Sequence, residues 1–273
     1  MRTRIILLIL LALPAFSQVR FLRLEQEVIA SRLKDMPLRD DQREAKLKEL
    51  FLAAGCGSAN VREQVVKHAK NPNVMCVVPG SSDRVIVVGA HFDHAERGAG
   101  AVDNWSGAAL LPSLLQSLAQ EKRVHTFVFV GFTSEELGCI GSQFYVNALT
   151  TDERARVDAM INMDTLGLAK TEVWQSHADA RLVKIAAMVS HALNLPLSAM
   201  NADGVGSTDS ESFREKKIPS IAFHSLTQET LPILHSDRDQ LSAVHLEHLY
   251  ESYKLIAAYL AYLDTAQIPE NKQ

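Results

Sequence analysis

The stretch Val85–Gly107, VIVVGAHFDHAERGAGAVDNWSG, is the part of the chain from which the fold can be inferred. Its first residues are mostly apolar, which predicts a strand buried on both faces, as in parallel or mixed sheets. That strand leads directly into His91 and Asp93, and Asp103 follows shortly before an apolar segment typical of a helix. Because open α/β sheets bind their ligands at the carboxyl ends of strands, these side chains are candidates for the functional site.

The same alternation of strand and helix continues along the chain. Strands are expected at residues 61–66, 73–78, 125–131, 158–164, 171–175 and 218–223, and helices at 19–33, 41–54, 104–119, 141–148, 178–193, 212–217 and 243–263. Such alternation implies a sheet with helices on both of its faces. No internal repeat or linker-like tract is present, so the sequence predicts a single α/β domain with a central mixed, mostly parallel β-sheet.

The first residues predict a secretory signal peptide. Arg2 and Arg4 precede a short apolar run, which is followed by Pro14 and a small-residue pattern that ends at Ser17. The run is shorter than the ~20 residues that a helix needs to span a bilayer. We therefore expect cleavage near Ser17, a mature domain of residues 18–273, and a secreted or periplasmic protein without stable membrane insertion. An uncleaved membrane anchor is the alternative.

Composition bounds the class of protein. The chain has 273 residues, 47% of them hydrophobic, which is enough for one sizeable core. Its 28 basic and 32 acidic residues give a net charge of −4, and loss of the two Arg in residues 1–17 makes the charge −6. No basic run is present, so nucleic acid is not expected as a partner. The oligomeric state cannot be inferred from composition.

The three cysteines have different expected states. In an oxidising compartment we expect a disulfide between Cys56, which ends a predicted helix, and Cys76, which lies in the next strand. Cys139 is expected to be buried and unpaired. No C-x-x-C pair occurs, which argues against a cysteine metal site.

Acidic and imidazole side chains recur after the predicted strands. They are His91 and Asp93, then Asp103, then Glu135 and Glu136, then Asp164, and finally His235. Carboxylates crowded at one edge of a sheet repel one another unless they share a cation or a proton. Imidazole and carboxylate without thiolate are typical of catalytic zinc sites, which keep one position open for water.

Two metal ions held close together need a bridging group. The carboxylate of Asp103 has the two oxygens that such a bridge requires. One further acid must stay off the metal to move protons, and the neighbours Glu135 and Glu136 can divide these roles because they point in different directions from a loop.

Taken in order, these residues resemble the M28 family of zinc aminopeptidases. The likeness covers about residues 73–264 and rests on His91-Phe92-Asp93, Asp103-Asn104 with Ser106-Gly107, Thr133-Ser134-Glu135-Glu136 with Gly138, Gly141-Ser142, Asn162-Met163-Asp164, and His235 with Asp239. The resemblance implies a zinc exopeptidase fold and two zinc ions per chain. By position it assigns His91 and Asp164 to one zinc, Glu136 and His235 to the other, and Asp103 to both.

The resemblance also implies the remaining roles. Glu135 corresponds to the general base that activates water, and Asp93 to a carboxylate that holds His91 in one tautomer. The peptide bond between Asp103 and Asn104 is expected to be cis.

In two places the chain departs from the family pattern. Asp209-Ser210 stands where many relatives have Asp-His, which leaves the ligands intact but alters a nearby pocket wall. Leu234 stands where aminopeptidases often have Tyr, which affects how a substrate carbonyl is held.

The resemblance implies a zinc-dependent exopeptidase that removes N-terminal residues from peptides, and the signal-peptide pattern implies that it is exported. One alternative is glutaminyl-peptide cyclotransferase, a related branch with one zinc, whose members tend to carry Trp at the position of Leu234. The other is a binding protein on an inactive scaffold, although such proteins usually lose ligands. No G-x-S-x-G elbow is present for a serine hydrolase. His94 and His224 are expected near the pocket and Trp105 is expected to pack, whereas the other histidines, His125 among them, are expected to lack a matched partner.

Overall fold

The described chain consists of helices and strands in alternation. The computed structural model describes residues 19–119, 121–200 and 206–265, so the predicted signal peptide lies outside them. The helices are α1 (Gln26–Lys34), α2 (Asp40–Ala53), α3 (Ser106–Leu118), α4 (Ile140–Ala148), α5 (Thr151–Arg156), α6 (Ala180–Leu193), α7 (Ser210–Glu215) and α8 (Leu246–Thr265). The strands are β1 (Val61–Gln64), β2 (Asn73–Val78), β3 (Val85–His91), β4 (Thr126–Phe132), β5 (Val157–Met163), β6 (Glu172–Val173), β7 (Ser198–Ala199) and β8 (Ser220–His224). Within these described ranges, no helix has both the length and the apolar character needed to cross a membrane.

The described strands join in one sheet, in the order β1-β2-β4-β3-β5-β8-β6-β7. Neighbours among β4, β3, β5 and β8 pair in parallel, whereas β1 and β2 continue the sheet antiparallel beyond β4. On the other side β6 pairs antiparallel with β8. The predicted mixed sheet with a parallel centre is therefore confirmed. Strand β3 lies between β4 and β5, and the chain forms β4 on one side of it before β5 on the other. Ligand sites of α/β sheets lie beside such a reversal of strand order.

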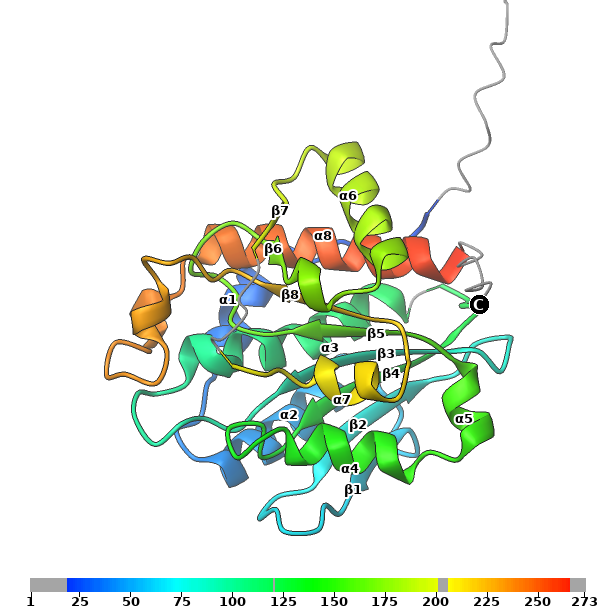
Figure 1. Cartoon of the computed structure of the whole chain (residues 1–273), viewed down its shortest axis with the longest axis horizontal. Coiled ribbons are helices and arrows are strands. Elements are labelled where there is room, and N and C mark those ends of the chain that lie inside the picture. The colour runs from blue at the N-terminus through cyan, green and yellow to red at the C-terminus, as the bar shows by residue number, and fades with distance from the viewer. Residues whose placement is uncertain (1–18, 120, 201–205, 266–273) are drawn as a thin grey trace, which may run out of the picture.

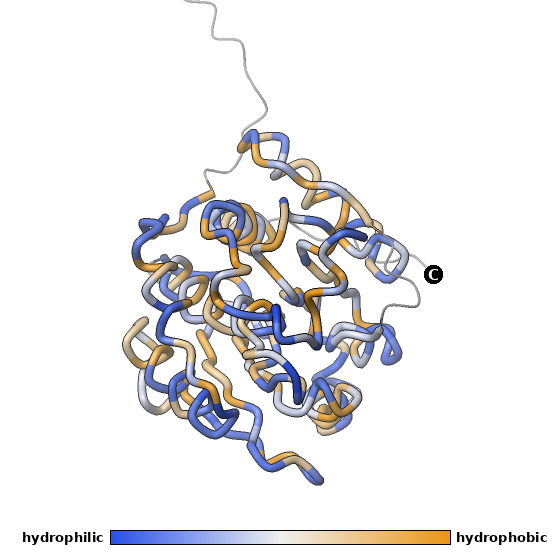
Figure 2. The backbone as a smooth tube through the Cα atoms, turned by 90° about the vertical axis from the view of Figure 1, so that its left-hand side faces the viewer, coloured by the Kyte–Doolittle hydropathy of each residue, from blue (hydrophilic) through white to orange (hydrophobic). Residues whose placement is uncertain are grey.

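Helices cover both faces of this sheet. In Figure 1, α6 and α8 lie on one side of the central strands, and α4 and α7 lie on the opposite side. Successive strand residues point to opposite faces, so Phe127 and Phe129 of β4 enter the larger core with α3 and α8. Val128 and Val130 pack instead with residues of α4 and α7. The tube in Figure 2 accordingly carries much of its orange, hydrophobic colour in the interior.

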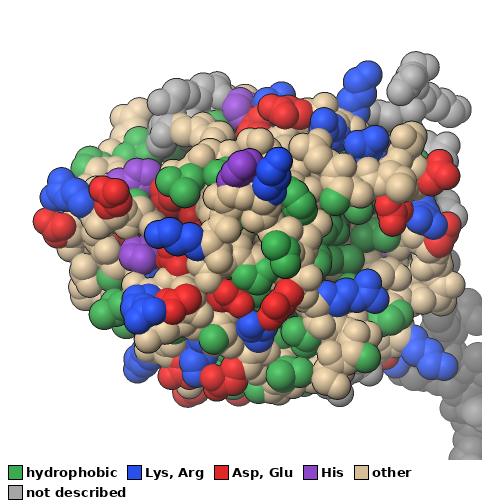
Figure 3. Space-filling view, turned by 90° about the horizontal axis from the view of Figure 1, so that it is seen from below, with side chains coloured by type: hydrophobic (Ala, Val, Ile, Leu, Met, Phe, Trp, Pro, Cys, Tyr) green, Lys and Arg blue, Asp and Glu red, His purple; other side chains and the backbone are tan. Residues whose placement is uncertain are grey.

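Charged side chains on the surface are mixed in sign. On the face seen in Figure 3, acidic and basic side chains are interspersed. Pairs with a well-exposed partner, such as Lys46 with Glu49, contribute little to stability because water screens them. Other acidic side chains, among them Asp93 and Asp103, are buried at the carboxyl ends of the parallel strands.

One local prediction was wrong, and one helix was not predicted. The helix expected from residue 19 begins only at Gln26, because the preceding segment is held by long-range contacts such as the hydrogen bond from Leu24 N to the Tyr253 hydroxyl (2.7 Å). Helix α5 was not predicted; it begins with a capping box in which Thr150 and Glu153 bind each other's backbone N–H groups.

The cysteine predictions are confirmed. Cys56 and Cys76 form a disulfide between the end of the α2 segment and β2. Cys139 is buried and free.

Candidate metal centre

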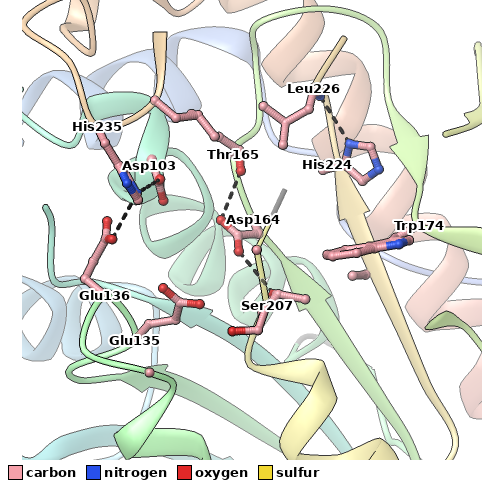
Figure 4. Close-up of a pocket in the computed structure, with 15 residues that line it drawn as sticks. Asp103, Glu135, Glu136, Asp164, Thr165, Trp174, Ser207, His224, Leu226 and His235 are labelled. Atoms are coloured by element: carbon pink, nitrogen blue, oxygen red, sulfur yellow. Dashed lines mark hydrogen bonds and ion pairs between the residues drawn. The ribbon is translucent and has the colours of Figure 1, made fainter. Parts of the chain in front are cut away.

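Side chains from five segments meet at the carboxyl edge of the parallel strands. His91 ends β3, the turn after β4 carries Glu135 and Glu136, and Asp164 directly follows β5. Asp103 comes from an irregular helical turn, Ala101–Trp105, just before α3, and His235 from the loop after β8. Figure 4 shows Asp103, the two glutamates, Asp164 and His235 around one pocket. Parallel strands bring them together because their carboxyl ends share one edge.

The side chains form two groups that share Asp103. His91 Nε2 lies 3.2 Å from Asp103 Oδ1 and 3.5 Å from Asp164 Oδ1. His235 Nε2 lies 3.3 Å from Asp103 Oδ2 and 3.0 Å from Glu136 Oε2. In each trio the potential ligand atoms lie within 4.8 Å of one another. The Asp103 carboxylate thus stands between the two histidines, with one oxygen toward each.

The backbone around Asp103 contains a cis peptide bond and is held by two other segments of the chain. The Asp103–Asn104 peptide is cis, as the resemblance implied. The buried carboxylate of Asp239 accepts hydrogen bonds from Val102 N (2.7 Å) and Asp103 N (3.3 Å). The Asn104 side chain donates to the carbonyl oxygen of Met163 at the end of β5 (2.9 Å). The loop after β8 and the end of β5 therefore fix where Asp103 lies.

Asp93 connects the two glutamates to His91. Its carboxylate accepts hydrogen bonds from the backbone N–H of Glu135 (3.1 Å) and of Glu136 (3.2 Å). The carboxylate lies 3.7 Å from His91 Nδ1, while the Asp93 carbonyl oxygen is closer, at 3.2 Å. The nearer contact to the imidazole thus comes from the main chain, and the carboxylate mainly holds the turn with the two glutamates.

Burial and crowding shift the pKa values of these groups. Burial, together with neighbouring acids, raises the pKa of Glu135 to about 9 and that of Glu136 to about 7. Burial alone would lower the pKa of His91, but Glu135, Asp103 and Asp164 outweigh it and hold this pKa well above its ordinary value. The hydrogen bond with Asp103 raises the pKa of His235 to about 9. Protons held by the two glutamates and the two histidines would therefore offset part of the negative charge of this centre.

A pair of divalent cations fits these residues. The acids gathered here are Asp93, Asp103, Glu135, Glu136, Asp164 and Asp209, and no Lys or Arg in the described part of the chain forms a salt bridge with any of them. His91 Nε2 and Glu136 Oε1 are buried without a hydrogen bond of acceptable geometry. Cations between the acids would satisfy these atoms, and imidazole with carboxylate is a donor set that suits zinc.

Sequence reasoning gave too little weight to Asp209. This residue precedes α7 and is fully buried, yet neither carboxylate oxygen has a hydrogen bond of good geometry with any described residue. Burial raises its pKa to about 7, and its charge acts on both Glu135 and Cys139. The available signal in the sequence was an acid in a short polar segment, and this pattern does not show that Asp209 lies close to the candidate metal centre.

A pocket of about 290 Å³ adjoins the centre. Its walls include Trp174, Leu226 and Leu234, and in Figure 4 Trp174 and His224 lie on the far side of Asp164 from the two glutamates. His224 accepts a hydrogen bond from Leu226 N at Nδ1 (3.1 Å), and burial lowers its pKa to about 4, so its ring is neutral.

Two other expectations concerned residues near the pocket. His94 does not line the pocket, and its Nδ1 lies 2.7 Å from Asp40 Oδ1. Trp105 is fully buried and donates to the Arg32 carbonyl oxygen, which agrees with the expected packing role.

Comparison with known proteins gives a consistent result. Residues 73–260 match peptidase family M28. Leucine aminopeptidase 1 of Trichophyton rubrum is 28% identical over 77% of this chain and 61% of its own length. The chain thus spans about three-fifths of the length of this curated relative. A zinc aminopeptidase from Bacillus subtilis has a TM-score of 0.64 at 24% identity, over 70% of this chain and 49% of that one. Glutaminyl cyclase of Porphyromonas gingivalis has a TM-score of 0.68 at 18% identity, over 86% and 95%.

Proposed function

The chain belongs to peptidase family M28, and on that premise we propose that it is a zinc-dependent aminopeptidase. The observation that carries the proposal is the position of Asp103, whose two oxygens lie 3.2 Å from His91 Nε2 and 3.3 Å from His235 Nε2. A carboxylate shared in this way is the bridge that a two-metal hydrolase needs. The names of the Trichophyton rubrum and Bacillus subtilis relatives support the same activity.

Five side chains are assigned to the metals. His91 and Asp164 would hold one zinc ion, Glu136 and His235 the second, and Asp103 both. When bound, such ions lower the pKa of a shared water and stabilise negative charge on the oxygen of the attacked carbonyl group.

Glu135 is assigned as the general base. It belongs to neither trio, but its Oε2 lies 3.8 Å from His91 Nε2, so the carboxylate borders the centre. From there it takes a proton from the attacking water and delivers it to the leaving amine. Asp93 supports this role by holding the backbone N–H of Glu135 and Glu136.

The pocket is assigned to the first residue of the peptide. The walls formed by Trp174, Leu226 and Leu234 suit an apolar side chain. The free, positively charged α-amine of the peptide would lie among the carboxylates at the closed end of the pocket. An acetylated amine carries no charge and would lose this electrostatic attraction. Cleavage is therefore confined to the N-terminal residue.

The test combines metal analysis with a substrate panel. Purified protein is expected to contain about two zinc ions per chain and to hydrolyse leucine amide and peptides with a free N-terminus, but not acetylated ones. Glu135→Gln should lower kcat by about 10³-fold with zinc retained, since general base catalysis contributes 10²–10⁴-fold. Glu49→Gln, at an exposed residue of α2, serves as control. Activity that survives Glu135→Gln would disprove the role of the base.

The glutaminyl cyclase of Porphyromonas gingivalis makes cyclisation the second candidate, because this chain covers 95% of its length. A peptide that begins with Gln distinguishes the two reactions. An aminopeptidase releases free glutamine, whereas a cyclase releases ammonia and leaves a blocked peptide. Ammonia release with one zinc per chain would favour the cyclase. No turnover, together with no effect of a chelator on thermal stability, would favour a binding protein.

We also propose export, with residues 1–17 removed. The disulfide between Cys56 and Cys76 supports this, because disulfides form and persist mainly in oxidising compartments. The intact mass of the mature protein should correspond to a chain that begins at Gln18, as glutamine or as pyroglutamate, and a mass that includes residues 1–17 would contradict the proposal.

A further inference from the structure

The two carboxylate oxygens of Glu135 have different surroundings. Oε2 is the oxygen nearer to the metal centre, 3.8 Å from His91 Nε2. Oε1 accepts a hydrogen bond from the thiol of Cys139, with Sγ at 3.3 Å. A carboxylate held at one oxygen keeps the other in a defined direction.

The backbone brings Cys139 to this position. Cys139 N and Gly138 N both donate to the Glu135 carbonyl oxygen, at 2.8 Å each, which closes a tight turn. Cys139 itself has a φ of 56°, a left-handed conformation that costs energy for a residue with a Cβ and persists only where the surroundings hold it. The same residue thus contacts Glu135 through its main chain and through its thiol.

The thiol has two polar neighbours, Glu135 Oε1 at 3.3 Å and Ser207 Oγ at 3.6 Å, and the shorter contact is the one to the carboxylate. Cys139 is buried, and burial raises the pKa of its thiol, with the charges of Asp209 and Glu135 acting in the same direction. Cys56 and Cys76 are paired with each other, so Cys139 remains a thiol. It belongs to neither of the two trios of potential metal ligands. Ser207 Oγ can donate to the sulfur, which leaves the thiol proton for Oε1 of Glu135.

We propose that Cys139 is a positioning residue, which holds Oε1 of Glu135 so that Oε2 exchanges the proton with water and with the leaving amine. The inference rests on the proposed role of Glu135 as general base. The new point is that only Oε2 transfers the proton, because the hydrogen bond from Cys139 occupies Oε1.

The first test is spectroscopic and needs no activity. Because Cys139 is the one free thiol of the chain, the S–H stretching band in an infrared or Raman spectrum reports this group alone. The band should move to higher frequency in Glu135→Ala, since loss of the acceptor strengthens the S–H bond. Glu49→Ala is the control and should leave the band in place. A band that does not move in Glu135→Ala would overturn the proposal.

The second test compares kinetics of Cys139→Ala and Cys139→Ser. Cys139→Ala should lower kcat about tenfold, the cost of one hydrogen bond, with KM changed less than about twofold. Cys139→Ser keeps a donor and should recover most of the loss. An unchanged kcat in Cys139→Ala, or an equal loss in both variants, refutes the positioning role. If Glu135→Gln is inactive while Cys139→Ala is fully active, only this inference fails; if Glu135→Gln remains active, the proposed function fails.

Discussion

Histidine lies between two carboxylates at both ends of the parallel strands, but the two clusters differ in their charge balance. At the carboxyl ends, six acids gather around His91 and His235 without a salt bridge to any described Lys or Arg. At the opposite edge, His125 lies between Asp158 and Asp264, and Arg84 and Arg123 pair with these acids. The second cluster is neutralised by the protein itself, whereas the first has no such salt bridge among the described residues and is the proposed metal centre.

The expectation that His125 has no matched partner was therefore wrong. Its Nε2 lies 3.1 Å from Asp158 and its Nδ1 3.3 Å from Asp264, so each ring nitrogen faces its own carboxylate. Burial lowers the pKa of His125, but the two acids outweigh this effect and raise it to about 9. Because the acids lie on opposite sides of the ring, their oxygens do not converge on one point. Whether a histidine and two acids suit an ion-pair network or a metal site thus depends on whether their ligand atoms point toward one common position.

The largest expected effect is on activity, from Asp103→Asn. The change removes the negative charge that the two histidines share, so kcat should fall at least ~10³-fold, and bound zinc should fall toward one ion or none. Asp158→Asn makes the same chemical change in the other cluster and should alter kcat less than about threefold. Comparable losses of kcat in Asp103→Asn and Asp158→Asn would show that the two clusters do not differ in function.

Removal of metal should destabilise the protein next most strongly. Without cations the buried acids at the carboxyl edge repel one another, and zinc at 100 times its Kd stabilises a protein by ~2.7 kcal/mol. We expect a chelator to lower Tm by several degrees and added zinc to restore it. His125→Asn should respond to the chelator as the original protein does. Equal Tm values with and without chelator would show that the acids need no metal.

His125→Asn should act on stability alone. The change removes a cation between Asp158 and Asp264, and Asp264 also accepts hydrogen bonds from Val124 N and His125 N. We expect the free energy of unfolding to fall by about 2 kcal/mol, since unpairing buried charges is costly. Urea unfolding of the zinc-saturated protein measures this, with kcat as the check. A large loss of kcat in a stable variant would assign the second cluster a part in catalysis.

The smallest expected effect is the pH dependence of the stabilisation that His125 contributes. His125 has a pKa of about 9 in the folded protein against 6.5 ordinarily, so the folded state holds the proton more tightly. The stabilisation is therefore complete below about pH 6.5 and is lost as the pH rises toward 9. The difference in unfolding free energy between the original protein and His125→Asn should shrink by about 1 kcal/mol over this range, allowing for partial solvent screening. Parallel pH curves would contradict the pairing.

Strong local patterns were predicted well, and weak ones were not. The apolar runs of β3, β4 and β5 are short, which favours strands over helices, and the disulfide joins two elements that are neighbours along the chain. Helix α5 has six residues, none of them buried, and only its cap marks it. The segment before α1 has helical spacing, yet its hydrogen bond to Tyr253 of α8 overrides that preference.

The sequence by itself determined which residues end the central strands, and hence that His91, Glu135, Glu136 and Asp164 meet at one edge. Only the tertiary structure shows how closely Asp103 approaches both histidines, that the buried Asp209 carboxylate has no hydrogen bond of good geometry among the described residues, and that the Cys139 thiol contacts one oxygen of Glu135. It likewise brought His125 to Asp264, 139 residues away. Residue type and order fix local backbone preferences, but the direction of a side chain depends on strand order and on the backbone angles of its loop.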